Sequence, residues 1–377
     1  MGDAGQGGLD TGAAATAVRL QALVDRTVAK RRIAHAILGV ARGDHGVPWI
    51  VAAGQARPGD PMGADTPFFV ASITKRFIAT LVLQAHERGE LAIDDPIVAL
   101  LPDELISGVH VLDGVDHTST ITVHHLLTHT SGLPDYFDKP RTGPSLFEQL
   151  AQGEDRSWTT ADAVRWAREE HRPHFAPQDL SARRQKARYS DTGFQLLIAI
   201  VEQVTGRSFA DLLHDRIFDR VGMAHTWLPG RSRPRADTPE PALIHAGRRP
   251  LDLPKMQESS NDLMSTAADL LRFQQALLRG DLFDQPATVA RLVERANLLR
   301  NIPPNRYGVG TWIFRINRLV APGPRPLTLI GHAGATGTWL FTCPELDVHL
   351  VGAVDQAAGQ RMPFRIMLQT LRALPRV

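Results

Sequence analysis

The sequence predicts an α/β fold of the α+β type, in which an antiparallel sheet flanked by helices is assembled from both ends of the chain. A mainly helical domain is inserted between those ends. Two observations predict this fold: hairpin patterns lie near the two ends of the 377 residues, and helical patterns fill much of the space between them. Strands at both ends around a helical middle are most simply joined in one sheet.

The N-terminal elements follow from local patterns. Residues 1–12 are rich in glycine and are expected to be flexible, whereas Ala13 to Lys30 carries apolar residues at helical spacing. Residues 37–54 predict a β-hairpin, because two apolar runs flank the turn signal Gly43-Asp44-His45-Gly46.

The middle and C-terminal elements complete the layout. A second hairpin is expected from residues 338–342 and 348–354, which flank the turn residues 343–347. Candidate helices lie between the two hairpins at Lys75 to Arg88, Ala161 to Glu170, Gly193 to Val204 and Thr266 to Leu278. We therefore expect an α/β domain made of residues 13–70 and 280–377, and a mainly helical domain made of residues 71–279.

The composition excludes several classes of function. The formal net charge is +2, which lacks the basic excess of a nucleic-acid-binding protein. Cys343 is the only cysteine, so no internal disulfide or cysteine-based zinc site can form, and we expect a small buried hydrophobe there. No export signal is visible, and no window reaches the roughly 18 apolar residues that cross a bilayer. We expect a protein without nucleic-acid or membrane partners and a cytoplasmic location, provided that no leader has been removed.

Residues 70–84, VASITKRFIATLVLQ, set Ser72 three places ahead of Lys75 at the start of an apolar helix. A serine there has a plain explanation as an N-cap. Lys75, however, lies one turn away on the same face, about 5 to 6 Å between Cβ atoms. The helix macrodipole disfavours a cation in the first turn, and a lysine with a lowered pKa can take a proton from a neighbouring hydroxyl. The pair therefore indicates a nucleophilic serine.

Two further segments offer partners for this serine. Residues 188–194, RYSDTGF, place Tyr189 and Asp191 two positions apart, so that in an extended loop both side chains point the same way. Each residue alone is most simply structural, Asp191 as a cap or turn residue and Tyr189 as a half-buried aromatic. Residues 331–337, GHAGATG, contain His332 and lead into a predicted strand, where small residues let a ligand approach the backbone.

With these motifs, the sequence resembles the serine β-lactamase and penicillin-binding-protein family, including class C lactamases, DD-peptidases, D-aminopeptidases and related esterases. SITK at residues 72–75 matches the SxxK motif, YSD at 189–191 matches YxN with Asp in place of Asn, and HAG at 332–334 matches the KTG or HxG motif. The phrases HHLLTHTSGLPDY (124–136), LMSTAADLLRF (263–273) and YGVGTW (307–312) also look like family signatures. The resemblance runs from about the first hairpin to the C-terminus.

The resemblance implies a β-lactamase/transpeptidase-like fold with an active site in the cleft between its two domains. Ser72 is then the nucleophile, and Lys75 and Tyr189 shuttle its proton. The backbone amides of Ser72 and Ala335 bind the oxyanion, while Asp191, His332 and Gly334 take the family's substrate-binding positions. Either Lys75 or Tyr189 serves as the base.

Two departures from the family pattern narrow the expected function. Asp191 puts a carboxylate beside Lys75, which favours the charged lysine and works against its use as a neutral base. His332 replaces the lysine that supports recognition of a substrate carboxylate in lactamases, and a histidine is only partly charged near neutral pH. This second departure lowers the expectation of efficient lactam hydrolysis and raises that of esters or amides without an adjacent anion.

Competing enzyme classes lack their own motifs. No GxSxG elbow of an α/β-hydrolase is present, and the histidines at 124, 125 and 129 do not form an HExxH or other zinc pattern. We therefore predict a serine hydrolase or acyltransferase that acts through a Ser72 acyl-enzyme, without metal or other cofactor. Its expected partners are a small ester or amide of small-molecule metabolism and an amine or alcohol acceptor. The alternatives are a β-lactamase or D-amino-acid peptidase, and a non-catalytic penicillin-recognising module; the oligomeric state is not predicted.

Overall fold

The computed structural model describes residues 6–30, 32–43, 47–317, 325–357 and 359–375. Within these residues, one large antiparallel sheet has nine strands in the order β10-β11-β12-β13-β14-β15-β1-β2-β3. The strands are β1 (His35–Arg42), β2 (Trp49–Arg57), β3 (Asp60–Pro61), β10 (Asn297–Leu298), β11 (Arg306–Tyr307), β12 (Trp312–Ile316), β13 (Leu327–Ala333), β14 (Thr338–Cys343) and β15 (Val348–Ala353). Strand β1 pairs with β15, with Ile37 opposite Ala353, which confirms that both ends of the chain build one sheet.

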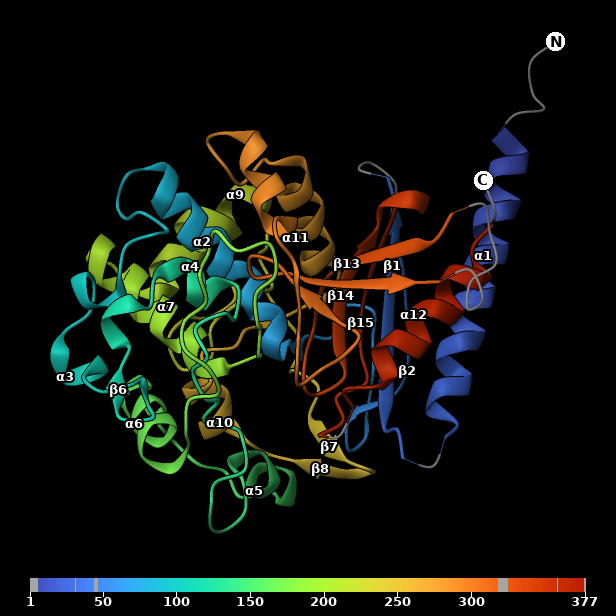
Figure 1. The fold of residues 1–377 in the computed structure, drawn as a ribbon. Helices are drawn as coiled ribbons and strands as arrows, with labels where there is room; N and C mark the ends of the chain where they lie inside the picture. The colour runs from blue at the N-terminus through green and yellow to red at the C-terminus, as the bar shows by residue number, and fades with distance from the viewer. Residues whose placement is uncertain (1–5, 31, 44–46, 318–324, 358, 376–377) are drawn as a thin grey trace.

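Helices cover both faces of this sheet (Figure 1). Helices α1 (Gln6–Val28) and α12 (Met362–Ala373) lie together on the outer face, and α11 (Ala267–Arg279) packs on the inner face against β1, β14 and β15. Gly39 on β1 lies under this helix, and a Cβ atom there would lie 2.6 Å from Val351 Cγ1 on β15 and 3.3 Å from Leu271 Cδ1 on α11, so a side chain would crowd both. The helix α11 falls inside the range expected to be a separate helical domain, but it is part of the sheet layers.

The helical part lies at the other side of the molecule in Figure 1 and is centred on α2. Helix α7 packs against α2, α6 and α4. The helices are α2 (Thr74–Glu87), α3 (Asp103–Ile106), α4 (Val123–Leu127), α5 (Leu146–Gln152), α6 (Thr160–Glu170), α7 (Asp191–Thr205), α8 (Phe209–Leu213), α9 (Asp219–Val221) and α10 (Pro254–Ser259). Three short strand pairs complete the structure: β4 (Phe68–Phe69) with β9 (Met264–Ser265), β5 (Val111–Leu112) with β6 (Val115–Asp116), and β7 (Ile244–Ala246) with β8 (Arg249–Leu251).

Helix α2 is the central element of the core. Every side chain from Thr74 to Ala85 is buried, including those of Lys75 and Arg76. Arg76 is 1% exposed, and its guanidinium donates hydrogen bonds to Thr311 Oγ1 at 2.7 Å and Gln274 Oε1 at 3.2 Å. A helix enclosed on all sides holds its N-terminal end in one position, which fixes the residues just before it.

The predicted helices and both hairpins are confirmed, with a few differences. Helix α1 begins at Gln6 and so includes residues 6–12, which were expected to form a flexible start, while residues 1–5 lie outside the described part. The turn residues 44–46 of the first hairpin also lie outside it. Residues 331–333 belong to β13, so only residues 334–337 form the turn into β14. Cys343 is fully buried, as predicted.

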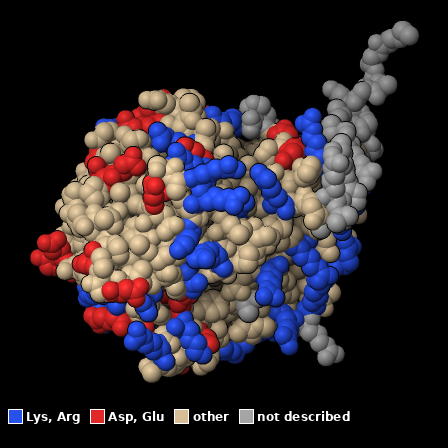
Figure 2. Space-filling view, in the orientation of Figure 1, with Lys and Arg blue, Asp and Glu red and all other residues tan. Residues whose placement is uncertain are grey.

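Charged side chains are unevenly distributed on the face shown in Figure 2. Lysine and arginine gather over the middle and right, where the helical part meets the sheet, while acidic residues lie mainly toward the left. No helix of the described residues is long and apolar enough to cross a membrane.

Candidate active site

Ser72 lies in a single 3₁₀ turn, Ala71–Ile73, immediately before α2. The preceding Ala71 has φ of 50°, in the left-handed region that alanine rarely adopts. Such backbone strain, of order 1 to 3 kcal/mol, persists only where the surroundings enforce it, and it is common at functional sites. The Ser72 hydroxyl caps neither the 3₁₀ turn nor α2, so the N-cap explanation does not apply.

Lys75 instead donates a hydrogen bond from Nζ to Ser72 Oγ at 3.0 Å. Its side chain is 4% exposed and forms an ion pair with Asp191, and its Nζ lies 5.2 Å from the centre of the Tyr189 ring. Burial lowers the pKa of Lys75, but the carboxylates of Asp191 and Asp262 outweigh burial, and the net pKa is raised. The expected lowered pKa is therefore wrong, and the expectation that Asp191 favours the charged lysine is supported.

Tyr189 is held at the site through its backbone. Its N–H donates to Asn301 Oδ1 at 3.0 Å, and Asn301 Nδ2 donates back to the Tyr189 carbonyl at 3.3 Å. Burial raises the pKa of the Tyr189 phenol well above its usual value, as does Asp191, while a hydrogen bond with Ser72 acts in the opposite direction. Tyr189 is therefore a neutral phenol in contact with the candidate nucleophile.

Two carboxyl groups, those of Asp191 and Asp262, act on the Lys75 ammonium, and a third, that of Asp135, lies beside Asp191. Asp191 is the first residue of α7, and its N–H donates to Asp135 Oδ2 at 3.0 Å. Burial and the nearby Asp191 raise the pKa of Asp135 well above its usual value, so this carboxyl takes up a proton readily. Burial also raises the pKa of Asp262 to about 6, although Lys75 opposes that shift. The site is thus acidic overall, with one cation among several carboxyls.

His332 lies beneath the site and not on its surface. Its side chain is 0% exposed, its Nδ1 donates to the Ala333 carbonyl at 2.8 Å, and its Nε2 accepts from the Tyr307 hydroxyl at 3.0 Å. Burial and the nearby Lys75 hold the pKa of His332 well below its usual value, which makes it a neutral imidazole. This direction argues against the expected partly charged histidine, while the expected contact of His332 with substrate stays a prediction. His332 supports the Tyr189 ring, with ring centres 6.1 Å apart.

Gly334 brings the β13–β14 turn against the 3₁₀ turn of Ser72. A Cβ atom on Gly334 would lie 2.1 Å from Thr338 Oγ1, 2.8 Å from Ala71 Cβ and 2.9 Å from the Val70 carbonyl, so no side chain fits. Within the described residues, the backbone N–H groups of Ser72 and Ala335 donate to no acceptor. Two unpaired amides on two turns packed together are what an oxyanion hole requires.

Several residues of the site were not singled out from the sequence. His129 contacts Tyr189 and Tyr307, with ring centres 4.5 Å and 4.3 Å away, and its backbone has φ of 57°. Both His129 and Tyr307 lie in phrases noted only as family signatures. Asn301 and Asp262 lie in no recognised pattern, because only the fold brings them to the site.

A second apolar cluster lies beside the serine and is separate from the main core. It includes Ala71 and the aromatic residues Phe69, Tyr136 and Trp158. Phe137 packs on this cluster, with its ring 4.4 Å from that of Tyr136, and remains partly exposed. The cluster therefore places apolar side chains beside Ser72, and Phe137 is a partly exposed residue packed on it.

The chain was compared with known families and proteins. A family model described as Beta-lactamase matches residues 20–373. Esterase EstB from Burkholderia gladioli is 33% identical over 214 residues, which cover 56% of this chain and 51% of the esterase. Monacolin J acid methylbutanoyltransferase from Aspergillus terreus is 40% identical over 102 residues, which cover 25% of this chain and 23% of the transferase. The chain thus matches about half the length, or less, of these curated relatives.

Structural comparison extends over nearly the whole chain. The crystal structure of a D-stereospecific amidohydrolase from Streptomyces sp. matches with a TM-score of 0.68 at 25% identity, covering 96% of this chain and 98% of the amidohydrolase. This likeness confirms the predicted β-lactamase/transpeptidase-like fold class.

Proposed function

The chain belongs to the Beta-lactamase family, and from this premise we propose that it is a serine hydrolase or acyltransferase that works through an acyl-enzyme on Ser72. Its substrate is a small ester or amide. One observation carries the proposal: Lys75 donates to Ser72 Oγ at 3.0 Å while it is paired with Asp191. A hydroxyl in contact with a group that can exchange protons is the arrangement of an activated nucleophile.

Lys75 acts as the base in this proposal, and Asp191 controls how readily it loses its proton. The lysine is charged in the resting site, so it must lose a proton before it can accept one from Ser72. Loss of that proton to solvent leaves a neutral amine facing the hydroxyl. Ser72 then gives its proton to this amine as its oxygen forms a bond to the carbonyl carbon of the substrate.

Tyr189 acts on the leaving group. The amides of Ser72 and Ala335 stabilise the oxyanion that develops on the carbonyl oxygen. As the C–O or C–N bond breaks, the neutral Tyr189 phenol donates its proton to the departing alcohol or amine. The Lys75 ammonium returns a proton to the phenolate, and water, an alcohol or an amine then attacks the acyl-enzyme.

The charges favour substrates without an anion next to the scissile bond. Lys75 is engaged with Asp191, and His332 is neutral and buried, so neither offers a free positive charge to a substrate carboxylate. This supports esters and simple amides over penicillins and D-alanyl peptides. Residues from both the sheet and the helical part contribute to the site, which supports the division into two domains with the active site between them.

A second candidate function is hydrolysis of amino-acid amides. Asp262, with a pKa of about 6, adds a second carboxylate near Lys75 at neutral pH, which suits a substrate with a free ammonium group. The likeness to a D-stereospecific amidohydrolase also supports this candidate. For acyl transfer, the support is the segment similar to a methylbutanoyltransferase and the apolar side chains beside Ser72.

The proposal is tested by intact-protein mass spectrometry after brief exposure to short-chain esters, amino-acid amides and a penicillin. We expect an acyl adduct on the wild type that is absent from Ser72→Ala. Ser107→Ala is the matched control, because that serine is exposed and lies outside the candidate active site. An adduct that persists in Ser72→Ala would exclude Ser72 as the nucleophile, and the compound that labels the wild type separates esterase, amidase and lactamase chemistry.

A further inference from the structure

A large pocket lies next to the candidate active site but contains none of its catalytic residues. Its volume is about 950 Å³, and a smaller pocket of about 390 Å³ adjoins it and shares Arg141, His171 and Arg172 with it. One wall is Arg188, which directly precedes Tyr189 and whose N–H donates to the His129 carbonyl at 2.9 Å. The pocket therefore begins one residue from the proposed general acid.

The lining of this pocket is basic. Five cationic side chains, those of Lys139, Arg141, Arg172, Lys186 and Arg188, face three carboxylates, those of Asp113, Asp138 and Glu170, which leaves a net charge of +2 with neutral histidines. A concave surface with one excess sign of charge concentrates ligands of the opposite sign.

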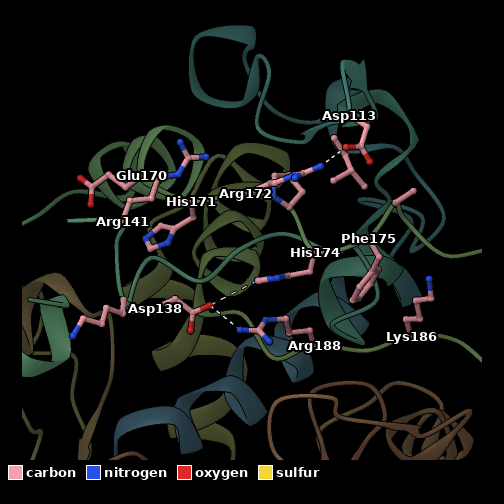
Figure 3. A pocket seen from close by; sticks show the side chains of 14 residues that line it. Asp113, Asp138, Arg141, Glu170, His171, Arg172, His174, Phe175, Lys186 and Arg188 are labelled. Atoms are coloured by element: carbon pink, nitrogen blue, oxygen red, sulfur yellow. Dashed lines mark hydrogen bonds and ion pairs between the residues drawn. The ribbon is translucent and has the colours of Figure 1, made fainter. Parts of the chain in front are cut away.

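Some of these charges are already paired. Arg188 lies 3.2 Å and His174 3.8 Å from Asp138 Oδ2, and Figure 3 shows both side chains converging on that carboxylate. Arg172 forms an ion pair with Asp113. These ion pairs fix the positions of Arg188, His174 and Arg172 in the lining of the pocket.

Other donors remain available. Arg141 and Lys186 are exposed and, within the described residues, form no ion pair or hydrogen bond through their side chains. The Nε of Arg188 also has no acceptor, but this atom is buried and the guanidinium is already paired with Asp138. Guanidinium groups with free N–H donors match the planar oxygens of carboxylates and phosphates, and a pocket with spare donors from one arginine and one lysine is suited to such an anion.

We propose that this pocket binds an oxyanion, a phosphate or a carboxylate, that the substrate carries at the end remote from the scissile ester or amide. The proposal deepens the proposed function and rests on it for the statement about substrate. It also gives a role to Lys186 and Arg188, which line the pocket, whereas the neighbouring basic residues Arg183 and Arg184 do not.

The first experiment measures binding alone, by isothermal titration of the full chain with inorganic pyrophosphate at low and at 0.15 M salt. We expect binding that weakens about tenfold or more in the double variant Arg141→Ala/Lys186→Ala, because the exposed, unpaired arginine and lysine of the pocket are both removed. Arg233→Ala is the matched control, since Arg233 is an exposed arginine that lines neither pocket. Absence of pyrophosphate binding, or equal binding by the double variant, would overturn the proposal.

The second experiment compares three butyrate esters whose short alcohol ends in a phosphate, a carboxylate or a hydroxyl. We expect kcat/KM to be about tenfold or more higher for one of the anionic esters than for the neutral one, and this ratio to fall toward one in the double variant. The preferred anion identifies the ligand as phosphate or carboxylate. Equal kcat/KM for all three esters would overturn the statement about substrate.

The two experiments distinguish failure of the proposed anion site from failure of the proposed reaction at Ser72. If Ser72→Ala still binds pyrophosphate as the wild type does, while no ester acylates the wild type, the proposed function fails and the anion site stands. If the neutral ester acylates Ser72 but pyrophosphate does not bind, the anion site fails and the proposed function stands.

Discussion

The ammonium of Lys75 and the carboxylate of Asp191 form an ion pair from which water is largely excluded, since the two side chains are 4% and 20% exposed. Ser72 is hydrogen-bonded to the same ammonium. The charge state of this one pair therefore decides when a proton acceptor faces the nucleophile, and the pH dependence of activity should follow it.

Replacement of Asp191 by Asn tests this relationship. Asp191 raises the pKa of Lys75, so its removal lowers that pKa, and the neutral amine appears at lower pH. We expect the acidic limb of the kcat/KM profile to move down by about 1 to 3 pH units, the usual effect of a paired opposite charge. The profile is measured with a neutral ester, and circular dichroism checks the fold. An unchanged acidic limb would show that Asp191 does not control the base.

Tyr189→Phe tests the role of the phenol on the leaving group. We expect kcat for an amide or alkyl ester to fall about 10² to 10⁴-fold, the usual contribution of general acid catalysis. A nitrophenyl ester should lose much less, because its leaving group departs without a proton. The measurement compares both substrate types in wild type and variant, and an equal loss for both would indicate that Tyr189 acts on Ser72 and not on the leaving group.

Much of the fold could be predicted from the sequence because local residue patterns determine where its helices and hairpins lie. The helix that begins at Thr74 and the hairpin around residues 343–347 are each set by neighbouring residues, and the structure has them within one or two positions. The partners of Ser72 within the SxxK and YSD motifs could be named for the same reason.

The environment of the site could not be read in this way. Whether Lys75 is charged depends on Asp262, which is far from it in sequence, and on burial that only the complete fold produces. His332 belongs to a recognised motif, but on strand β13 its side chain lies in the core, where it forms a hydrogen bond with the Tyr307 hydroxyl. Asn301 and Tyr189 lie in irregular segments that are far apart in the sequence. No periodic pattern of residues predicts that these two segments meet.

The buried position of His332 gives a prediction about the family's lysine. His332→Lys places a charge where burial already holds the histidine neutral, and Tyr307 would face an ammonium in place of an acceptor nitrogen. We expect the free energy of unfolding to fall by about 2 to 5 kcal/mol without a gain in penicillin hydrolysis. Urea denaturation and a penicillin hydrolysis assay measure the two effects. Tyr307→Phe is the comparison, with an expected loss of about 1 kcal/mol for one hydrogen bond and an unpaired His332 Nε2. A stable His332→Lys variant that hydrolyses penicillin would show that residue 332 can reach the cleft.

Gly334→Ala tests whether the contact between the β13–β14 turn and the Ser72 turn sets the oxyanion hole. An added methyl group would lie 2.1 Å from Thr338 Oγ1 and 2.8 Å from Ala71 Cβ, so one turn must move away from the other. Overpacking of this kind costs about 1 to 3 kcal/mol, and displacement of one oxyanion donor lowers kcat about 10² to 10³-fold. Gly12→Ala is the matched control, because it lies in α1 with nothing within 4 Å of the added atom, and alanine there stabilises the helix by up to about 1 kcal/mol. Denaturation midpoints and kcat with a neutral ester are measured for both variants. If Gly334→Ala loses stability but keeps its kcat, the two turns pack together without positioning the amides of Ser72 and Ala335 for catalysis.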